Sequence, residues 1–417
     1  MNTPDKVKIL DGKITLYKTT KKDKKGKLYL NQVWQAILKT PSSTGRIRVS
    51  TGLKNLEEAK VKAKDLLLQA EARVQTGLPL VSPKFKTMAE QYLEWLRKNS
   101  PTQNKITVQE RQIRNSLIPY FKDKLLHTFS TKDIEKYHEQ RTTQGVARTG
   151  KPVSGNTKNY MNSILNGIFK YAQREQYIKE LPKMPTYSSH NQRASFTLEE
   201  MNLLQEKLDH WITAYDNSEA PHIQDYRKLF RLYVMIIYYA GIRPSSEMNS
   251  IHWSTIKYGK TKDGQDYIQI PVITSKNKKG IDKTRGVIAM PQLKPYLEYI
   301  KTQESLYNPN NYMFIHPKTT QLNKKYIGTP IKTFKTQFRS FMVWSGLLIE
   351  KNPPYRERCL YSLRHTYFEQ RILNNQVPLM ALAENCGTSI QVIQKWYAEL
   401  QAEQFADSLA GLMMKNN

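Results

Sequence analysis

The heptapeptide Tyr361-Ser362-Leu363-Arg364-His365-Thr366-Tyr367 predicts a helix with one buried stripe. Apolar residues recur around it at helical spacing, at Leu360, Leu363, Tyr367, Ile372 and Leu373. Tyr361 and Arg364 are three residues apart and therefore share one face of the helix. An arginine beside an apolar stripe needs an anionic partner, because burial of an unpaired guanidinium is costly. His365 is interpreted as a helix-packing residue.

A second motif, Gly387-Thr388-Ser389-Ile390, follows and precedes Trp396-Tyr397. Gly387 is suited to the end of a helix, and Thr388 or Ser389 to the N-cap of the next one. Ile393, Tyr397 and Leu400 then share one face of a terminal helix.

A third motif lies upstream, where residues 226–240 become apolar all round and predict a buried helix. Gly241 ends this helix, and Pro244 fits the first turn of the next one. Arg243 is therefore held in a tight corner between two buried helices. Arg243 and Glu247 are also spaced as an ordinary i, i+4 ion pair, which is the purely structural interpretation.

Together, Ala-Gly-Ile-Arg-Pro-Ser-Ser-Glu (240–247), Ser-Leu-Arg-His-Thr (362–366) and the Gly-Thr-Ser-Ile to Tyr397 segment resemble the signature of tyrosine recombinases (phage-type integrases). The resemblance implies that Arg243 and Arg364 are catalytic and that Tyr397 is the nucleophile. It also implies one catalytic lysine in a β-hairpin, which the alternation of Tyr267–Ile273 and Gly286–Met290 predicts. Lys276 is the best match, and Lys278 remains the alternative.

This sequence departs from the family pattern at two positions. Tyr361 stands where the family most often has histidine, three residues before the second arginine. A phenol can donate a hydrogen bond to a phosphate but cannot exchange protons near neutral pH as imidazole does. Thr388 stands where histidine often follows the glycine, and it is a weak candidate for the lost hydrogen bond.

The composition is that of a globular protein with a polyanionic partner. The 417 residues have a formal net charge of +29 and are 39% hydrophobic. Such a charge favours nucleic acid or an anionic membrane surface. We expect no membrane span and no secretory signal, because no long apolar run exists. Cys359 and Cys386 form neither a disulfide framework nor a metal motif, so we expect no structural zinc and a reducing, cytoplasmic compartment. The resemblance implies that strand transfer needs neither metal nor cofactor, and it implies a nucleoid-associated protein of bacteria.

Residues 1–80 predict a small domain with a three-stranded antiparallel sheet, from Lys13–Thr19, Leu28–Lys39 and Gly45–Thr51, followed by a helix over residues 55–76. Residues 1–80 contain seventeen Lys and Arg but only seven Asp and Glu. Basic residues cluster at a hairpin tip, where they either face solvent or enter a DNA groove: Lys21, Lys22, Lys24 and Lys25. The position resembles the arm-type DNA-binding domain of integrases.

Residues 84–182 predict an all-helical domain that resembles the family's core-binding domain. Its fourth helix starts after Ser154, follows a loop over Gly145–Val153, and buries a face that includes Tyr160, Ile164 and Ile168. Lys158, Lys170 and Arg174 lie on other faces, either as solvent-facing residues or as DNA phosphate contacts. The catalytic domain is expected at residues 195–417, opened by the capping box Thr197-Leu198-Glu199-Glu200.

The expected fold is therefore multidomain and mainly α: a small sheet-plus-helix domain, a helical domain and an α+β catalytic domain. The resemblance implies a site-specific recombinase that acts as a homotetramer on double-stranded DNA with core and arm-type sites, with accessory DNA-bending or excision proteins as further partners. The apolar tail, with Phe405, Leu409, Leu412 and Met413, is expected to pack on its own or a neighbouring catalytic domain. Alternatives are an inactive DNA-binding regulator on the same scaffold and a basic membrane-surface protein.

Overall fold

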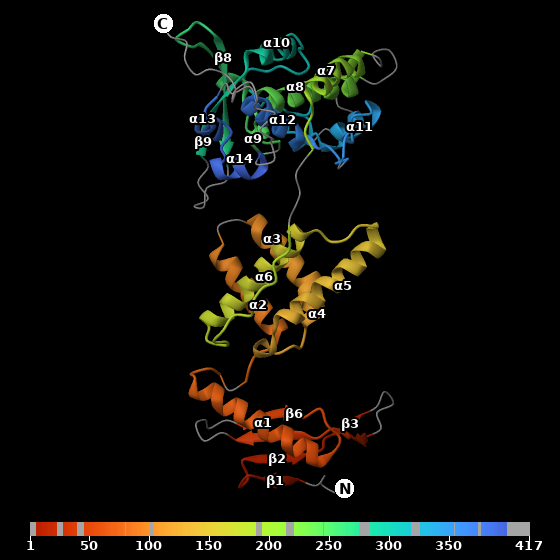
Figure 1. Cartoon of the computed structure of the whole chain (residues 1–417), viewed down its shortest axis with the longest axis vertical. Coiled ribbons are helices and arrows are strands. Elements are labelled where there is room, and N and C mark those ends of the chain that lie inside the picture. Colours follow the sequence, from red (N-terminus) through yellow and green to blue (C-terminus); the bar gives the residue numbers. More distant parts are fainter. Residues whose placement is uncertain are drawn as a thin grey trace. The chain divides into compact units, whose positions relative to one another are not determined.

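The computed structural model describes most of the chain (Figure 1). The described residues are 6–22, 28–39, 46–79, 81–100, 103–188, 194–213, 221–244, 246–274, 283–317, 326–353, 355–373 and 377–397, without the side chains of 21, 22, 221 and 395–397. The chain divides into two compact units, Met1–His190 and Asn191–Asn417. No described helix is long and apolar enough to cross a membrane.

The first unit begins with a four-stranded antiparallel sheet of order β1-β2-β5-β6. Its strands are β1 (Val7–Ile9), β2 (Ile14–Tyr17), β5 (Gln35–Lys39) and β6 (Arg46–Ser50). Helix α1 (Leu56–Gln75) packs on β2 and β5 and buries Ala59, Ala63 and Leu67 against the sheet (Figure 1). The predicted helix is confirmed, and Asn55 caps its N-terminus by accepting hydrogen bonds from the backbone N–H groups of Glu57 and Glu58.

The prediction of three strands was wrong in two respects. Leu10 and Asp11 adopt positive φ, and the chain turns back there so that β1 pairs with β2; the three-residue pattern Val-Lys-Ile is too short to mark a strand by alternation. The segment Leu28–Lys39 forms two strands, because residues 31–34 leave the ladder. Its first part, β4 (Leu28–Leu30), pairs with β3 (Thr20–Lys22) as a separate two-stranded ribbon.

The helical part of the first unit has its own core, built by helices whose apolar residues recur every three or four positions. The elements are α2 (Phe85–Asn99), α3 (Gln103–Gln112), a π-helical turn (Ile113–Leu117), α4 (Ile118–Phe121), a 3₁₀ turn (Leu126–Thr128), α5 (Thr131–Thr149) and α6 (Gly155–Arg174). The predicted loop from Gly145 was wrong, since α5 continues to Thr149 and ends at Gly150, which has φ +68°. Tyr160 was also misplaced, because it is 39% exposed.

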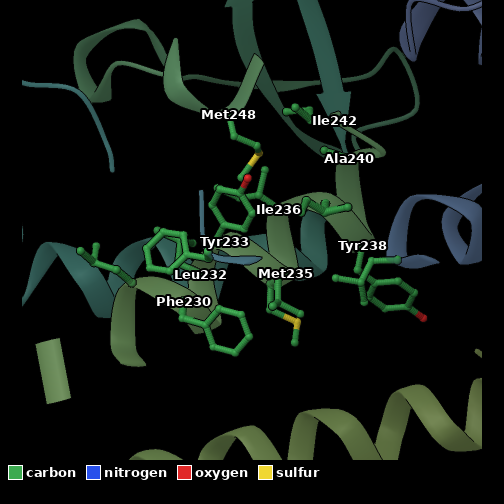
Figure 2. Packing of buried hydrophobic residues seen from close by; sticks show 14 of the residues in the cluster. Phe230, Leu232, Tyr233, Met235, Ile236, Tyr238, Ala240, Ile242 and Met248 are labelled. Atoms are coloured by element: carbon green, nitrogen blue, oxygen red, sulfur yellow. The ribbon is translucent and has the colours of Figure 1, made fainter. Parts of the chain in front are cut away.

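The second unit is organised around α8 (Pro221–Ala240), whose last three turns are buried. Figure 2 shows buried side chains of this helix, among them Phe230, Tyr233 and Met235, together with Met248 of α9 (Ser246–Asn249). Helices α7 (Leu198–Thr213), α10 (Lys294–Lys301), α11 (Lys335–Trp344) and α12 (Leu360–Leu373) pack against α8. The predicted capping box opens α7: Thr197 N donates to Glu200 Oε2, and Glu200 N donates to Thr197 Oγ1, both at 3.1 Å.

An antiparallel sheet of order β7-β8-β9 lies beside these helices. Its strands are β7 (Lys257–Lys260), β8 (Asp266–Thr274) and β9 (Lys283–Ala289). The predicted hairpin is β8 and β9, whereas β7 is an additional strand that pairs with β8. The last described elements of the unit are α13 (Leu379–Asn385) and α14 (Ile390–Tyr397). Helix α13 contacts both β9 and α14 (Figure 1).

Candidate active site

Arg243 lies in the corner that follows α8, as predicted. Gly241 turns the chain there with φ +60°, and a Cβ at this position would lie 2.5 Å from the ring of Tyr367, so only glycine fits. The side chain of Arg243 is 12% exposed. Its guanidinium forms an ion pair with Glu247 through Nη1 and donates from Nη2 to the carbonyl of Gly387. The i, i+4 pair therefore exists, and Arg243 also reaches the turn before α14.

Glu247 is the acidic centre of this cluster, with its side chain 2% exposed. Its carboxylate accepts hydrogen bonds from Arg243 N at 3.0 Å and from Arg243 Nη1, and forms a second ion pair with Arg285 Nη2 at 3.0 Å. Burial by itself raises the pKa of Glu247. Arg285 and Arg243 outweigh that effect and hold the pKa below its ordinary value of 4.5. Glu247 is thus a carboxylate at neutral pH and orients two guanidiniums.

Arg364 extends from α12 into the same cluster and is only 4% exposed. Its Nη1 donates to the carbonyl of Gly241, and its Nη2 donates to the carbonyl of Cys386 at 2.8 Å. These direct partners are carbonyls that lack partners at two helix ends, and the expected anionic partner of Arg364 stays a prediction. Burial lowers the pKa of Arg364, yet a guanidinium remains protonated at neutral pH.

The segment between α13 and α14 carries the second predicted motif. Gly387 has φ +60° and ends α13, and Thr388 N donates to Ala383 O at 2.9 Å. Ser389 caps α14, since its Oγ accepts from Val392 N at 3.3 Å, which confirms one of the two predicted caps. Ile393 is buried beside Tyr367, Phe368 and Leu382 and anchors α14. Tyr397 is the last residue of α14, and its side chain lies outside the described residues.

The other two candidates near Arg364 are partly buried. Tyr361 lies on the first turn of α12, and its ring centroid is 6.2 Å from that of His365. Thr388 is partly buried directly after Gly387, whose carbonyl Arg243 binds. Tyr361 and Thr388 are thus close in sequence to residues of the arginine contacts, and their roles stay predictions.

Sequence reasoning missed Arg285, which β9 contributes to the site. Its side chain is 13% exposed, pairs with Glu247, and donates from Nη1 to the carbonyl of Asn385. The alternation of the strand could have identified it, since Arg285 falls on the same face as the buried Val287 and Ala289. An arginine on the inward face of a strand predicts a buried partner.

Comparisons with known proteins give relatives by structure alone. No family model matches the sequence, and no curated protein matches it. The Tn1549 transposon integrase in complex with circular intermediate DNA is 12% identical, with a TM-score of 0.57 over 77% of this chain and 98% of that one. A lambda integrase dimer bound to a COC′ core site is 15% identical, with a TM-score of 0.52 over 95% and 97%. A lambda integrase tetramer bound to a Holliday junction is 16% identical, with a TM-score of 0.50 over 92% and 95%.

This chain has the tyrosine recombinase fold. The fold class expected from the sequence, with a small N-terminal sheet, a helical region and an α+β C-terminal region, is confirmed. Within this recombinase fold, the structure brings Arg243 and Arg364 together at the turn that leads to Tyr397. Lys276 and Lys278 lie between β8 and β9, outside the described residues, so the choice between them stays a prediction.

The predicted DNA-binding residues of the recombinase fold have varied surroundings. Lys170 is exposed on α6, whereas Lys158 lies 4.9 Å above the ring of Tyr187. Arg174 stacks on Trp95 at 4.6 Å, and its guanidinium is paired with Glu175 at 2.7 Å. In the N-terminal ribbon, Lys21 and Lys22 lie on β3 without described side chains, and Lys24 and Lys25 lie outside the described residues.

The charge of Glu247 predicts a pH-dependent stability. Because the pKa of Glu247 is lower in the folded than in the unfolded protein, its charge stabilises the fold above about pH 4.5. This stability is lost as the pH falls through the folded-state pKa. Glu247→Gln is expected to cost roughly 3 kcal/mol at neutral pH, because it leaves two guanidiniums without their carboxylate. The difference in thermal midpoint between wild type and Glu247→Gln should therefore shrink below about pH 4.5.

The matched control is Glu357→Gln, since Glu357 pairs with Arg339 on the surface with its side chain 49% exposed. A surface pair of this kind contributes little, so this variant should follow wild type throughout. A Glu247→Gln deficit that stays constant down to about pH 3 would contradict a charged Glu247.

Proposed function

We propose that this protein is a site-specific DNA recombinase of the tyrosine recombinase family, which integrates or excises a mobile element through a covalent 3′-phosphotyrosine. One observation carries the proposal. Arg243 and Arg364 come from separate parts of the chain, and both donate to the short turn of Cys386 and Gly387. That turn leads directly into α14, which ends at Tyr397. The two guanidiniums are thus joined by hydrogen bonds to the turn from which the helix of Tyr397 starts.

The arginines suit the charge that develops during strand cleavage. A phosphodiester carries negative charge on its non-bridging oxygens, and more accumulates as a nucleophile adds to phosphorus. Guanidinium forks bind such oxygens bidentately and stabilise that charge. Among the described site residues, Glu247 is a carboxylate paired with the guanidiniums of Arg243 and Arg285, and Arg364 adds a third guanidinium that binds carbonyls. This leaves a positive excess for the phosphate.

Tyr397 is the proposed nucleophile. Its Oη attacks phosphorus, so that the Oη–P bond forms and the bond from phosphorus to the 5′-oxygen breaks. The phenol proton passes to water, a loss that nearby cations favour because they stabilise phenolate. Lys276 donates a proton to the leaving 5′-oxygen as general acid. The phosphotyrosine retains the energy of the DNA bond, so the free 5′-hydroxyl of another strand can attack it and reverse the chemistry.

Tyr361 and Thr388 take the places of the two histidines that the family often has. Both are proposed as hydrogen-bond donors to the phosphate, without the proton exchange that imidazole provides near neutral pH. The arginines then supply most of the charge stabilisation. Tyr361 is the better supported of the two, because it lies on α12 one turn before Arg364.

The remaining parts of the chain are proposed to bind double-stranded DNA. The net charge of +29 favours association with phosphates. Residues 1–80 would bind arm-type sites. Residues 84–182 would bind the core site through Lys158, Lys170 and Arg174. Residues 195–417 would cleave the DNA strand. Recombination exchanges four strands, so we propose a homotetramer on DNA, with accessory DNA-bending or excision proteins. The predicted tail contacts at Phe405, Leu409, Leu412 and Met413 lie outside the described residues.

The test starts from the attachment core, obtained by sequencing the junctions of the element that carries this gene. A duplex with this core and a nick close to the scissile phosphate traps the enzyme, because the short cleaved fragment diffuses away. Wild-type protein should form a protein–DNA adduct that survives denaturing electrophoresis. It should do so in excess EDTA, since side chains supply every cation that the proposed mechanism uses.

The same duplex without the nick is the control, because religation there prevents the adduct from accumulating. Absence of any adduct on the nicked duplex, with tight binding retained, would favour an inactive DNA-binding regulator. Cleavage that requires Mg²⁺ would contradict the proposed chemistry.

A further inference from the structure

Three consecutive backbone carbonyls at the end of α13 are each bound by a different arginine. Arg285 donates to the carbonyl of Asn385, Arg364 to that of Cys386, and Arg243 to that of Gly387. The last carbonyls of a helix have no partner within the helix and form its negative end, so guanidiniums are suitable partners. Two of these arginines are proposed phosphate ligands, whereas Arg285 has no assigned role.

The side chain of Asn385 joins the same turn to the edge strand β9 by two hydrogen bonds. Ile288 N donates to Asn385 Oδ1 at 2.8 Å, and Asn385 Nδ2 donates to Ile288 O at 3.0 Å. The side-chain amide thus pairs with β9 as a neighbouring strand residue would, on the edge of the order β7-β8-β9. Together with Arg285, this places two independent contacts between β9 and the turn. Strand β9 also ends the hairpin that contains Lys276 and Lys278.

The guanidinium of Arg285 spans Glu247 and the turn. Nη2 lies 3.0 Å from Glu247 Oε2, while Nη1 reaches the carbonyl of Asn385. The guanidinium also lies against Gly387, where a Cβ would approach its Cζ to 2.9 Å. A fork with two separated donors makes both contacts at once, which the single ammonium of lysine cannot do.

We propose that Arg285 is a positioning residue for strand cleavage, which holds the turn Asn385–Gly387, and with it α14 and Tyr397, against Glu247 and β9. The inference rests on the proposed recombinase function. Arg243 and Arg364 must turn donors towards a bound phosphate, which weakens their own contacts with the turn. Arg285 and Asn385 provide contacts that do not depend on those donors. The turn therefore keeps α14 in place while the two arginines engage DNA.

The test uses the full-length protein and the nicked duplex, with DNA at saturating concentration so that the rate reports cleavage and not binding. Arg285→Ala and Arg285→Lys should both form the adduct roughly 100-fold more slowly than wild type, because displacement of the nucleophile by about 1 Å costs that much. Arg285→Lys retains the charge and should not rescue the rate. Asn385→Ala keeps every charge and should also slow the adduct. DNA affinity should stay at the wild-type value in all three.

Arg339→Ala is the matched control, because Arg339 is a paired but exposed arginine of the same unit, with its side chain 62% exposed. It should cleave at the wild-type rate. Wild-type rates in Arg285→Lys and Asn385→Ala would overturn the inference, as would full rescue by lysine. If thermal unfolding shows that Arg285→Ala does not fold, the two milder variants decide the question. No adduct with wild-type protein would overturn the proposed function itself, which separates the two failures.

Discussion

Tyr397→Phe is expected to bind DNA with wild-type affinity and to form no covalent adduct on the nicked duplex. The substitution removes only the hydroxyl, so the packing of α14, anchored by Ile393, is retained. Because the variant lacks the attacking oxygen of the proposed mechanism, the loss should exceed roughly 1000-fold, as for removal of other catalytic nucleophiles. Denaturing electrophoresis measures the adduct, and a mobility-shift assay measures binding.

Tyr355→Phe is the matched control, because Tyr355 lies in the same unit and is 60% exposed. This variant should form the adduct at the wild-type rate. An adduct that persists in Tyr397→Phe would remove Tyr397 as the nucleophile. Peptide mapping of the adduct would then identify the residue that is attached to DNA.

Arg364→Lys is expected to have the second-largest effect. The variant keeps a positive charge, but its single nitrogen cannot bind the carbonyls of Gly241 and Cys386 together and still offer a fork to phosphate. Loss of one such donor slows related reactions by roughly 100- to 1000-fold. A buried carbonyl left without a partner also costs about 1–3 kcal/mol of stability. Single-turnover cleavage and thermal unfolding measure the two effects separately.

Arg339→Lys makes the same chemical change on the surface and should affect neither measurement. Cleavage by Arg364→Lys at the wild-type rate would mean that charge alone, without the fork, is sufficient. A loss of stability without a loss of cleavage at a permissive temperature would restrict Arg364 to supporting the turn. Either result would revise the assignment of the second arginine.

The two proposed phosphate ligands also hold the turn before α14. The carbonyls of Cys386 and Gly387 accept their hydrogen bonds. If the proposed mechanism holds, phosphate binding and the placement of α14 are expected to be coupled through the same guanidiniums. Glu247 holds Arg243 and Arg285 by two ion pairs that do not involve the carbonyls of the turn.

Local patterns predicted the elements of the site well. Helical periodicity located α12 and its buried Leu363 and Tyr367. The end of α8 at Gly241 was predicted because glycine adopts positive φ without strain. The cap of α14 was predicted because a serine side chain accepts a hydrogen bond from the first turn of a helix. The hairpin of β8 and β9 followed from alternation and a Lys- and Gly-rich turn. These features rest on interactions between residues close in sequence, and such interactions can be read without knowing the fold.

The pairing of short strands was less predictable. Strand β1 is three residues long, and its partner, not its own pattern, makes it a strand. Strand β7 likewise depends on pairing with β8, because Lys-Tyr-Gly-Lys shows no apolar alternation. A short segment with weak preference takes its structure from the neighbour that offers free hydrogen-bonding groups.

The sequence by itself determined the fold class, the identity of Arg243, Arg364 and Tyr397 as candidates, and the breaks at Gly241 and Gly387. Only the tertiary structure showed which atoms the guanidiniums bind. Arg364 donates to the carbonyls of Gly241 and Cys386, two partners that no local pattern of the sequence indicates. Arg285 was found only in the fold, because its contacts with Glu247 and Asn385 join residues far apart in the chain. Buried polar groups take whichever partners packing brings within reach, and packing between distant segments is not encoded in any local pattern.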